Sequence, residues 1–190
     1  MASSNDSISK TIIVAVALCL VCSIFVAGAA VGLKPIQQEN RDLDRKRNIL
    51  AAAQMLQPGQ NIDEVFANVE KRLVNVAEGR FATEEELAQA GITVAAYNQQ
   101  AAAKDPALSV SLSGDQDPAS IKRRANFATV YVVKDENADA RIILPVHGYG
   151  LWSTMYGFMA LEGDFSTVVG FGFYQQAETC LLYTSPSPRD

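Results

Sequence analysis

The sequence predicts an α+β protein in which one N-terminal transmembrane helix is followed by an antiparallel sheet flanked by helices. Three observations support this fold class. Residues 11–33 carry no charge, residues 34–125 show helix-like and loop-like patterns, and residues 126–179 alternate strand-like runs with turns. We expect residues 1–10 to form a tail. Because the chain has 190 residues, the part after the apolar run is long enough for about one compact domain.

Charge and cysteine content exclude two classes of protein. The formal net charge is -5, so the chain has no general attraction for phosphate backbones and nucleic acid is a poor partner. Three cysteines at Cys19, Cys22 and Cys180 do not form a disulfide framework. The Cys19/Cys22 pair has C-x-x-C spacing, but such metal and cluster sites need four thiolates, and buried free cysteine usually packs as a small apolar residue.

The strongest signal is the uncharged run from Thr11 to Leu33, which Lys10 and Lys34 bracket. About 20 apolar residues cross a hydrocarbon core of ~30 Å as a helix. A cleaved signal peptide is the alternative, because Ala27 to Ala29 fits the small-x-small cleavage pattern, although the run exceeds the usual apolar region of about 7 to 15 residues. We therefore predict a retained anchor.

Two further features concern the surroundings of the anchor. Gly28 and Gly32 are four residues apart, a spacing that lets membrane helices approach closely, although small residues are common in such helices anyway. Basic residues are more numerous after the run than before it, and this count favours a cytoplasmic domain. The basic residues that follow the run are Lys34, Arg41, Arg45, Lys46 and Arg47.

Residues 34–125 read as helices and loops. Pro35 can start a new helix at its first turn. The apolar positions between Ile62 and Val76 recur with helical spacing, and Asn61 with Glu64 resembles a capping box at the start of that helix. Thr83 and Glu86 repeat the cap before a segment that is ambiguous between helix and loop.

Asp117 and Pro118 predict a short helix that carries three basic residues. A solvated basic face explains those residues better than an anion site does, because three charges are a weak signal. They are Lys122, Arg123 and Arg124.

Four strands are predicted in the last part of the chain, and we expect them to form an antiparallel meander. In the first strand both alternating sets of side chains are mostly apolar, so helices should pack on the sheet. Gly170 and Gly172 share one face of the last strand and leave room for a planar ligand or another backbone, unless they mark only a bulge. The predicted strands are Phe127 to Lys134, Ile142 to Val146, Trp152 to Leu161 and Val168 to Tyr174.

One loop stands out chemically. It runs from Pro145 to Trp152 and holds the lone histidine, His147, the lone tryptophan and two glycines. No hydrolytic or metal-binding set accompanies it, so we predict no catalytic and no metal-ligating residue. The composition suits a flat aromatic ligand, whereas a hairpin turn with its tryptophan in the core is the commoner structure for such a pattern.

Several separated blocks, in the right order from Met1 to Thr179, resemble the flavin-bearing C subunit of the sodium-translocating NADH:quinone oxidoreductase. The blocks are Ser7-Ile8, Lys10-Thr11, Ala29-Ala30-Val31-Gly32-Leu33, Ile121 to Asn126, Val130-Tyr131, Val133-Lys134-Asp135, Ile143-Leu144-Pro145, His147-Gly148, Gly150-Leu151-Trp152-Ser153 and Met155-Tyr156.

This resemblance implies an electron-transfer role. In that family a periplasmic domain carries flavin mononucleotide (FMN), joined through its phosphate to a threonine, and relays electrons one at a time. The complex is a translocase of the bacterial inner membrane that oxidises NADH, reduces ubiquinone and pumps sodium, so the implied partners are its other membrane subunits and lipid. The implied periplasmic side conflicts with the charge count after Leu33, and we follow the family.

The resemblance also implies which residues surround the flavin and where this chain departs from the family. The family's Ser-Gly-Ala-Thr attachment motif is absent, and residues 180–190 do not continue the family's pattern, so we interpret them as a non-native tail. Residues 126–179 would then be a partial FMN-binding sheet region that cannot hold FMN covalently and is inactive in isolation. A membrane-anchored periplasmic interaction module without a cofactor is the alternative. The implied cradle residues are His147, Gly148, Gly150, Leu151, Trp152, Glu178 and Thr179.

Overall fold

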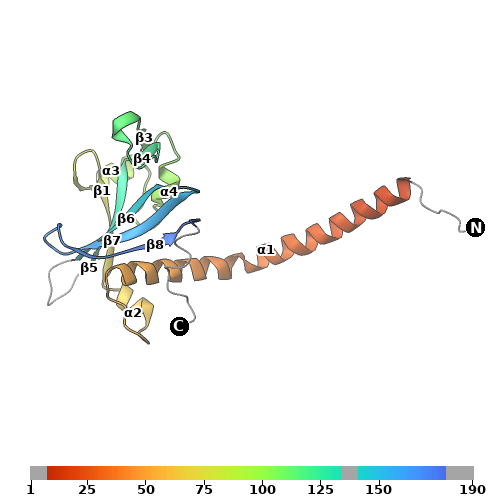
Figure 1. The fold of residues 1–190 in the computed structure, drawn as a ribbon, viewed down its shortest axis with the longest axis horizontal. Helices are drawn as coiled ribbons and strands as arrows, with labels where there is room; N and C mark the ends of the chain where they lie inside the picture. The colour runs from red at the N-terminus through yellow and green to blue at the C-terminus, as the bar shows by residue number, and fades with distance from the viewer. Residues whose placement is uncertain (1–7, 134–140, 179–190) are drawn as a thin grey trace, which may run out of the picture. The chain divides into compact units, whose positions relative to one another are not determined.

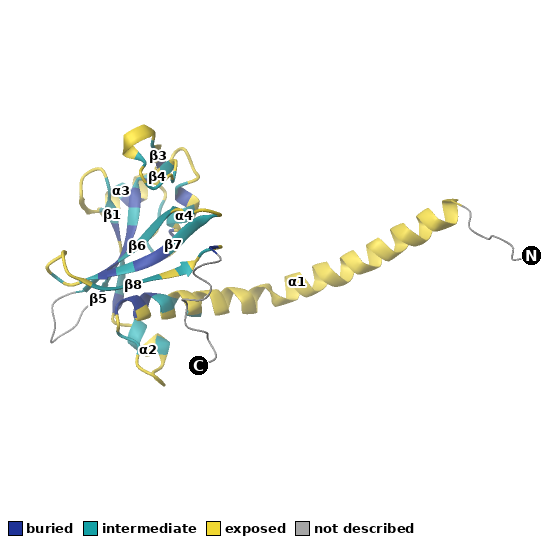
Figure 2. Ribbon diagram, viewed as in Figure 1, coloured by how far each residue is buried: buried dark blue, intermediate teal, exposed yellow. Residues whose placement is uncertain are grey.

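The computed structural model describes residues 8–133 and 141–178. The chain divides into two compact units, Met1–Asp44 and Arg45–Asp190. Thr179 and the predicted tail at residues 180–190 lie outside the described residues. Figure 1 shows the elements, and Figure 2 shows that buried residues gather on the sheet and on the last turns of the first helix.

The predicted apolar helix is present and is longer than expected. Helix α1 runs from Ile8 to Ala52 without interruption and contains Pro35. Its most apolar window has a mean hydropathy of 2.9 and no buried residue, so by length and composition it can cross a membrane. The prediction that Pro35 begins a separate helix is wrong. A proline removes one backbone donor, and the turns on either side keep their own hydrogen bonds.

The last turns of α1 belong to the second unit. Ile49 and Leu50 are fully buried there, and Lys46 Nζ donates a hydrogen bond of 2.6 Å to Asp63 Oδ1. Asp63 lies in the short helix α2, Ile62–Phe66. The end of α1 is therefore a core element of the domain.

The predicted helix from Ile62 to Val76 is wrong beyond its first turns. Asn61 caps α2 and accepts a hydrogen bond from Asp63 N, but Glu64 bonds the Asn61 side chain and not its backbone, so the predicted capping box is only half formed. Helix α2 ends at Phe66, and strand β1 runs from Val69 to Asn75. Val69 and Leu73 are both buried. Because they are four residues apart, the pair fits both the helical and the strand period, and pairing with a neighbouring strand decides between them.

Within residues 8–133 and 141–178, six strands form one antiparallel sheet in the order β2-β1-β5-β6-β7-β8. The four strands predicted from the sequence form the meander β5 to β8, as expected. Strands β1 and β2 extend it from the region predicted as helix and loop. The bounds are β2 Arg80–Phe81, β5 Phe127–Val133, β6 Arg141–Tyr149, β7 Thr154–Leu161 and β8 Val168–Gln175.

Short elements between β2 and β5 cover one part of the sheet. The predicted cap at Thr83 and Glu86 is confirmed as a complete capping box at the start of α3, Glu84–Gln89. The helix predicted at Asp117 is wrong: both carboxylate oxygens of Asp117 accept backbone N–H groups, from Ile121 and Lys122, and close a turn instead. The remaining elements are α4 Gln99–Ala102, β3 Ser109–Ser111, the 3₁₀ turn η1 Gly114–Gln116 and β4 Arg123–Ala125.

The described part of the domain contains two clusters of buried hydrophobic residues. The larger one joins Ile49 and Leu50 of α1 to Tyr131, Ile143 and Phe158 of the sheet. The smaller one joins Leu73 and Phe127 to α3 and α4. The sheet is therefore covered by helices as predicted, and the cover comes largely from the end of α1 and from short helices.

Candidate functional site

The predicted loop is the tip of the β6–β7 hairpin. Strand β6 continues three residues past the predicted end and pairs His147 with Tyr156 and Tyr149 with Thr154. Residues 150–153 form the turn, which is closed by a 2.8 Å hydrogen bond from Gly150 N to Ser153 O. Trp152 therefore lies in the turn and not in a strand.

His147 lies at the inner end of the site. Its ring stacks on Tyr156 with ring centroids 5.6 Å apart and planes 20° from parallel. Burial lowers the pKa of the imidazole below its usual value because the charged form loses hydration. At neutral pH the side chain is a neutral aromatic ring that packs on tyrosine.

Leu151 and Trp152 lie at the outer end. Leu151 is 78% exposed and Trp152 is 69% exposed. The hairpin turn is thus present, but the alternative that its tryptophan packs in the core is wrong. A turn of four residues places the two side chains beyond the last paired residues, where no element of the described chain covers them.

Glu178 lies beneath this turn although it follows β8. It is only 7% exposed, and its Oε1 accepts hydrogen bonds from Trp152 N at 3.0 Å and Ser153 N at 3.4 Å. A buried carboxylate needs such donors because it has lost water. The structure therefore brings Glu178 to the loop, as the resemblance implies.

The two glycines of the loop have different surroundings. A Cβ at Gly150 would collide with Glu178 Oε1, so the space beside this glycine is already filled by the carboxylate. A Cβ at Gly148 would make an ordinary 3.5 Å contact with Ala119 Cβ. The backbone at Gly150 is therefore approached by a side chain of this chain, and the backbone at Gly148 is not.

Sequence reasoning missed two contributors to the site, Ser153 and Tyr156. Tyr156 could have been found from the hairpin register, because partners across this turn have residue numbers with a constant sum. The role of the Ser153 amide depends on Glu178, which is 25 residues away, and local pattern does not reveal it. Thr179, the last predicted cradle residue, lies outside the described residues.

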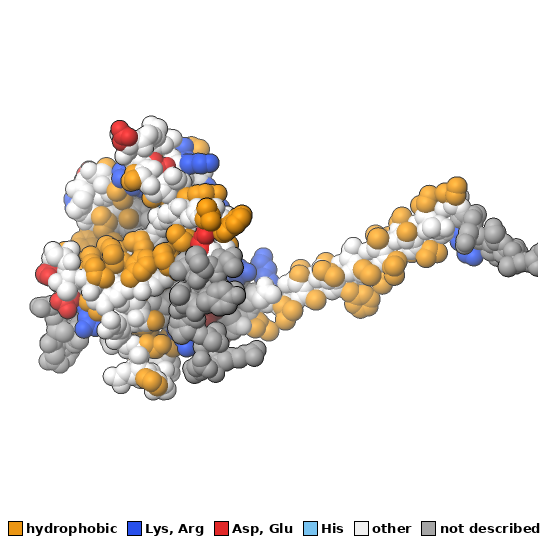
Figure 3. Space-filling view, viewed as in Figure 1, with side chains coloured by type: hydrophobic (Ala, Val, Ile, Leu, Met, Phe, Trp, Pro, Cys, Tyr) orange, Lys and Arg blue, Asp and Glu red, His pale blue; other side chains and the backbone are white. Residues whose placement is uncertain are grey.

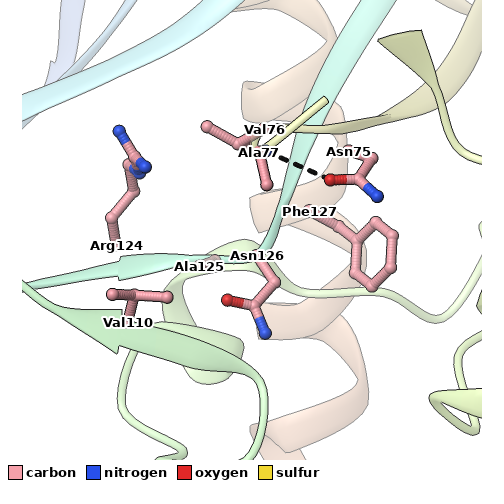
Figure 4. A pocket seen from close by; sticks show the side chains of 8 residues that line it. All are labelled: Asn75, Val76, Ala77, Val110, Arg124, Ala125, Asn126 and Phe127. Carbon is pink, nitrogen blue, oxygen red and sulfur yellow. Dashed lines mark hydrogen bonds between the residues drawn. The ribbon is translucent and has the colours of Figure 1, made fainter. Parts of the chain in front are cut away.

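A separate hollow of about 290 Å³ lies where β1, β4 and β5 meet (Figure 4). Its wall is mostly apolar, and the Asn75 side chain on its rim accepts a hydrogen bond of 3.1 Å from Ala77 N. None of its lining residues belongs to the predicted cradle. They are Asn75, Val76, Ala77, Val110, Arg124, Ala125, Asn126 and Phe127.

The three basic residues near β4 have separate environments. Arg123 donates hydrogen bonds to the side chain and the carbonyl of Ser109 at 2.9 and 3.0 Å, so it braces β4 against β3. Lys122 and Arg124 are exposed. The solvated basic face predicted here thus holds for two of the three residues.

Comparison with known proteins identifies the family. The chain is 48% identical over 180 residues to the C subunit of the Na(+)-translocating NADH-quinone reductase of Pseudomonas aeruginosa, and this match covers 93% of the chain and 66% of the relative. It is 49% identical over 180 residues to the same subunit of Vibrio campbellii, with 94% of the chain and 68% of the relative covered. The chain belongs to this family, known as NqrC. The members of the family are named as parts of an oxidoreductase that uses NADH and quinone and translocates sodium. No family model matches the chain.

Solved NqrC structures agree with the fold. The crystal structure of Shewanella oneidensis NqrC superposes with a TM-score of 0.62 at 32% identity, over 75% of this chain and 62% of that one. The structure of the same subunit from Parabacteroides distasonis, at 21% identity and a TM-score of 0.54, shares the fold over 77% of this chain and 60% of that one. The chain spans about two thirds of the length of its NqrC relatives.

Proposed function

We propose that the β6–β7 turn forms one side of an FMN cradle in a membrane-anchored subunit that relays electrons from NADH toward ubiquinone. The observation that supports this most is the pair of exposed apolar side chains, Leu151 and Trp152, on a turn held by the buried Glu178. A protein controls a flavin by positioning its ring and by placing dipoles or charge near it. An indole and a leucine on a fixed turn suit a planar ring system.

The residues present fit non-covalent binding of FMN. Trp152 offers a face for stacking, and Leu151 offers apolar contact at the edge of the ring. The turn amides of Trp152 and Ser153 are engaged by Glu178, so recognition falls to side chains. When bound, FMN would supply one-electron transfer. The chain has no Ser-Gly-Ala-Thr sequence, so this proposal involves no covalent link within it.

We place the subunit in the inner membrane, with α1 as a retained span, the domain on the periplasmic side and the other membrane subunits as partners. The family and the apolar helix support this placement. Gly28 and Gly32 are four residues apart in α1, and this spacing supports close contact of this face with a partner helix. Replacing both glycines by leucine should abolish assembly and leave the domain folded. Unaltered assembly would exclude that face.

N-terminal sequencing of the mature chain distinguishes a retained membrane anchor from a cleaved signal peptide.

FMN binding can be tested with the chain's own tryptophan, because Trp152 is the only one. The full chain in detergent is titrated with FMN while tryptophan emission is recorded. Saturable quenching is expected. Leu151→Ser should weaken binding by about tenfold, because it removes the burial of one leucine side chain.

Val168→Ser is the matched control, since Val168 is 54% exposed on β8 and outside the cradle. Its affinity for FMN should equal that of the parent chain. Absence of saturable quenching, or equal weakening by both substitutions, would contradict the proposed cradle and favour the alternative of an interaction module without a cofactor.

A further inference from the structure

We propose that Glu178 is a positioning residue, whose carboxylate holds the β6–β7 turn in the shape that presents Leu151 and Trp152. This inference rests on the proposed flavin cradle and assigns to Glu178 a role different from contact with the ligand. It makes the segment after β8 a structural part of a site that lies on another hairpin.

The hydrogen bonds of Glu178 connect its side chain to the backbone of the turn. Both donors to Oε1 are consecutive backbone N–H groups of the turn, from Trp152 and Ser153. Carboxylate oxygens only accept, and two converging N–H groups match them. Since Glu178 is buried, these bonds form in a poorly hydrated place where charge-assisted bonds are strong.

The turn leaves room for the Glu178 carboxylate because residue 150 is a glycine. Any side chain at Gly150 would occupy the position of Glu178 Oε1, so the close approach of this carboxylate requires glycine there. The turn is also tied at its entry, where Tyr149 N donates to Ala119 O at 2.8 Å. Glu178 thus holds the other end of the turn, at Trp152 and Ser153, by hydrogen bonds.

Glu178 is itself held in place by a hydrogen bond next to the end of β8. Its own backbone N donates to Gln176 Oε1 at 2.6 Å, which fixes the start of the segment that follows β8. Strand β8 ends at Gln175 and pairs with β7, which begins directly after the turn. The carboxylate therefore approaches the turn from a fixed neighbouring strand, and its loss frees the turn without removing a strand.

The test uses the full chain in detergent and three substitutions. Glu178→Ala removes the acceptor, Gly150→Ala displaces it, and Glu178→Gln keeps an oxygen in the same place. The anisotropy of Trp152 emission without FMN measures how firmly the turn is held, and the FMN titration measures the site. Glu162→Ala, which removes an exposed glutamate at the opposite end of β7, is the matched control.

Glu178→Ala and Gly150→Ala should each lower the anisotropy and weaken FMN binding by about tenfold. Glu178→Gln should restore most of both, and Glu162→Ala should match the parent chain. Rescue by glutamine separates positioning through an acceptor from a need for negative charge at the ligand. If Glu178→Ala fails to fold, Gly150→Ala and Glu178→Gln still decide.

Unchanged anisotropy in both Glu178→Ala and Gly150→Ala would overturn the proposal, and so would a Glu178→Gln variant as defective as Glu178→Ala. If anisotropy falls as expected while the parent chain itself binds no FMN, the positioning role stands and the cradle fails. The two proposals are therefore separated by the same set of measurements.

Discussion

At the scale of single residues, three glycines of β7 and β8 differ in what surrounds them. A Cβ at Gly157 would lie 2.8 Å from the carbonyl oxygen of Gly172, and one at Gly170 would collide with the carbonyl oxygen of Ala52. Gly172 has nothing within 4 Å of such a Cβ. The room predicted over Gly170 is thus taken by another backbone, the end of α1, which was one of the two expected occupants.

This difference predicts the effect of alanine at each site. Gly157→Ala should lower the free energy of unfolding by roughly 1–3 kcal/mol, because the new methyl group meets backbone that cannot rotate away. Gly172→Ala should change it by less than about 0.5 kcal/mol. Urea denaturation followed by circular dichroism measures both. If Gly157→Ala lowers the free energy of unfolding as little as Gly172→Ala does, the prediction is contradicted, because β7 and β8 would then make room for the added methyl group.

His147 predicts a pH dependence of stability. Burial lowers its pKa below the usual 6.5, so the unfolded chain binds more protons than the folded chain just below that pH. The free energy of unfolding should therefore fall as the pH decreases through about 6.5. It should stop falling below the lowered pKa of the folded state.

The measurement compares urea denaturation at about pH 7.5 and 5.5, where carboxylates titrate little. His147→Phe keeps a ring against Tyr156 and removes the chain's only imidazole, so the pH dependence should flatten. A slope that survives in this variant would assign the effect to other groups.

At the scale of elements, α1 combines two roles in one continuous helix. Leu33 is 49% exposed in the apolar segment, whereas Leu50 is fully buried in the domain core. Leu50→Ala should lower the free energy of unfolding of the domain by about 2–5 kcal/mol, because it leaves a cavity between α1 and the sheet. Leu33→Ala should leave that value unchanged. Denaturant unfolding in detergent, followed by a signal from the sheet, compares the two, and equal losses would contradict the division of roles.

Sequence patterns predicted some elements well for physical reasons. The meander β5 to β8 was predictable because strand-like apolar runs and the turns between them are local signals. Strand β1 was not, because Val69 and Leu73 satisfy two periods at once and only pairing with β5 decides. At the site, the hairpin tip was predictable from its glycines. The contact of Glu178 with Trp152 spans 26 residues, and only the resemblance pointed to it.

At the scale of the whole molecule, the division into two units predicts how much of the N-terminus can be deleted before the domain no longer folds. A variant that starts at residue 41 lacks the apolar segment and keeps Ile49 and Leu50, so it should fold and stay in the aqueous phase. One that starts at residue 54 lacks both core residues and should not fold. Sedimentation after alkaline washing of membranes, with circular dichroism of the soluble fractions, tests both. A cooperative transition in the shorter variant would show that α1 is dispensable for the core.

The sheet also presents hydrophobic side chains to solvent. Val168, Phe171 and Phe173 of β8 are exposed, and Figure 3 shows hydrophobic side chains gathered where β7 and β8 lie in Figure 1. The two phenyl rings contact each other edge to face, with centroids 4.8 Å apart. Strand β8 carries no charged residue, so this face is an apolar surface of the domain.

The two edges of the sheet differ in length and charge, and this difference favours one edge for the addition of a further strand. On one side, the two residues of β2 cover only the end of β1, and the uncovered part of β1 carries the charged residues Glu70, Lys71 and Arg72. Strand β8 ends the other side with eight residues and no charge to repel a newcomer. Edges of that kind act as templates for strand addition. Within the described residues, a further strand from another molecule or a peptide would find its longest uncharged edge at β8 and would extend the sheet there.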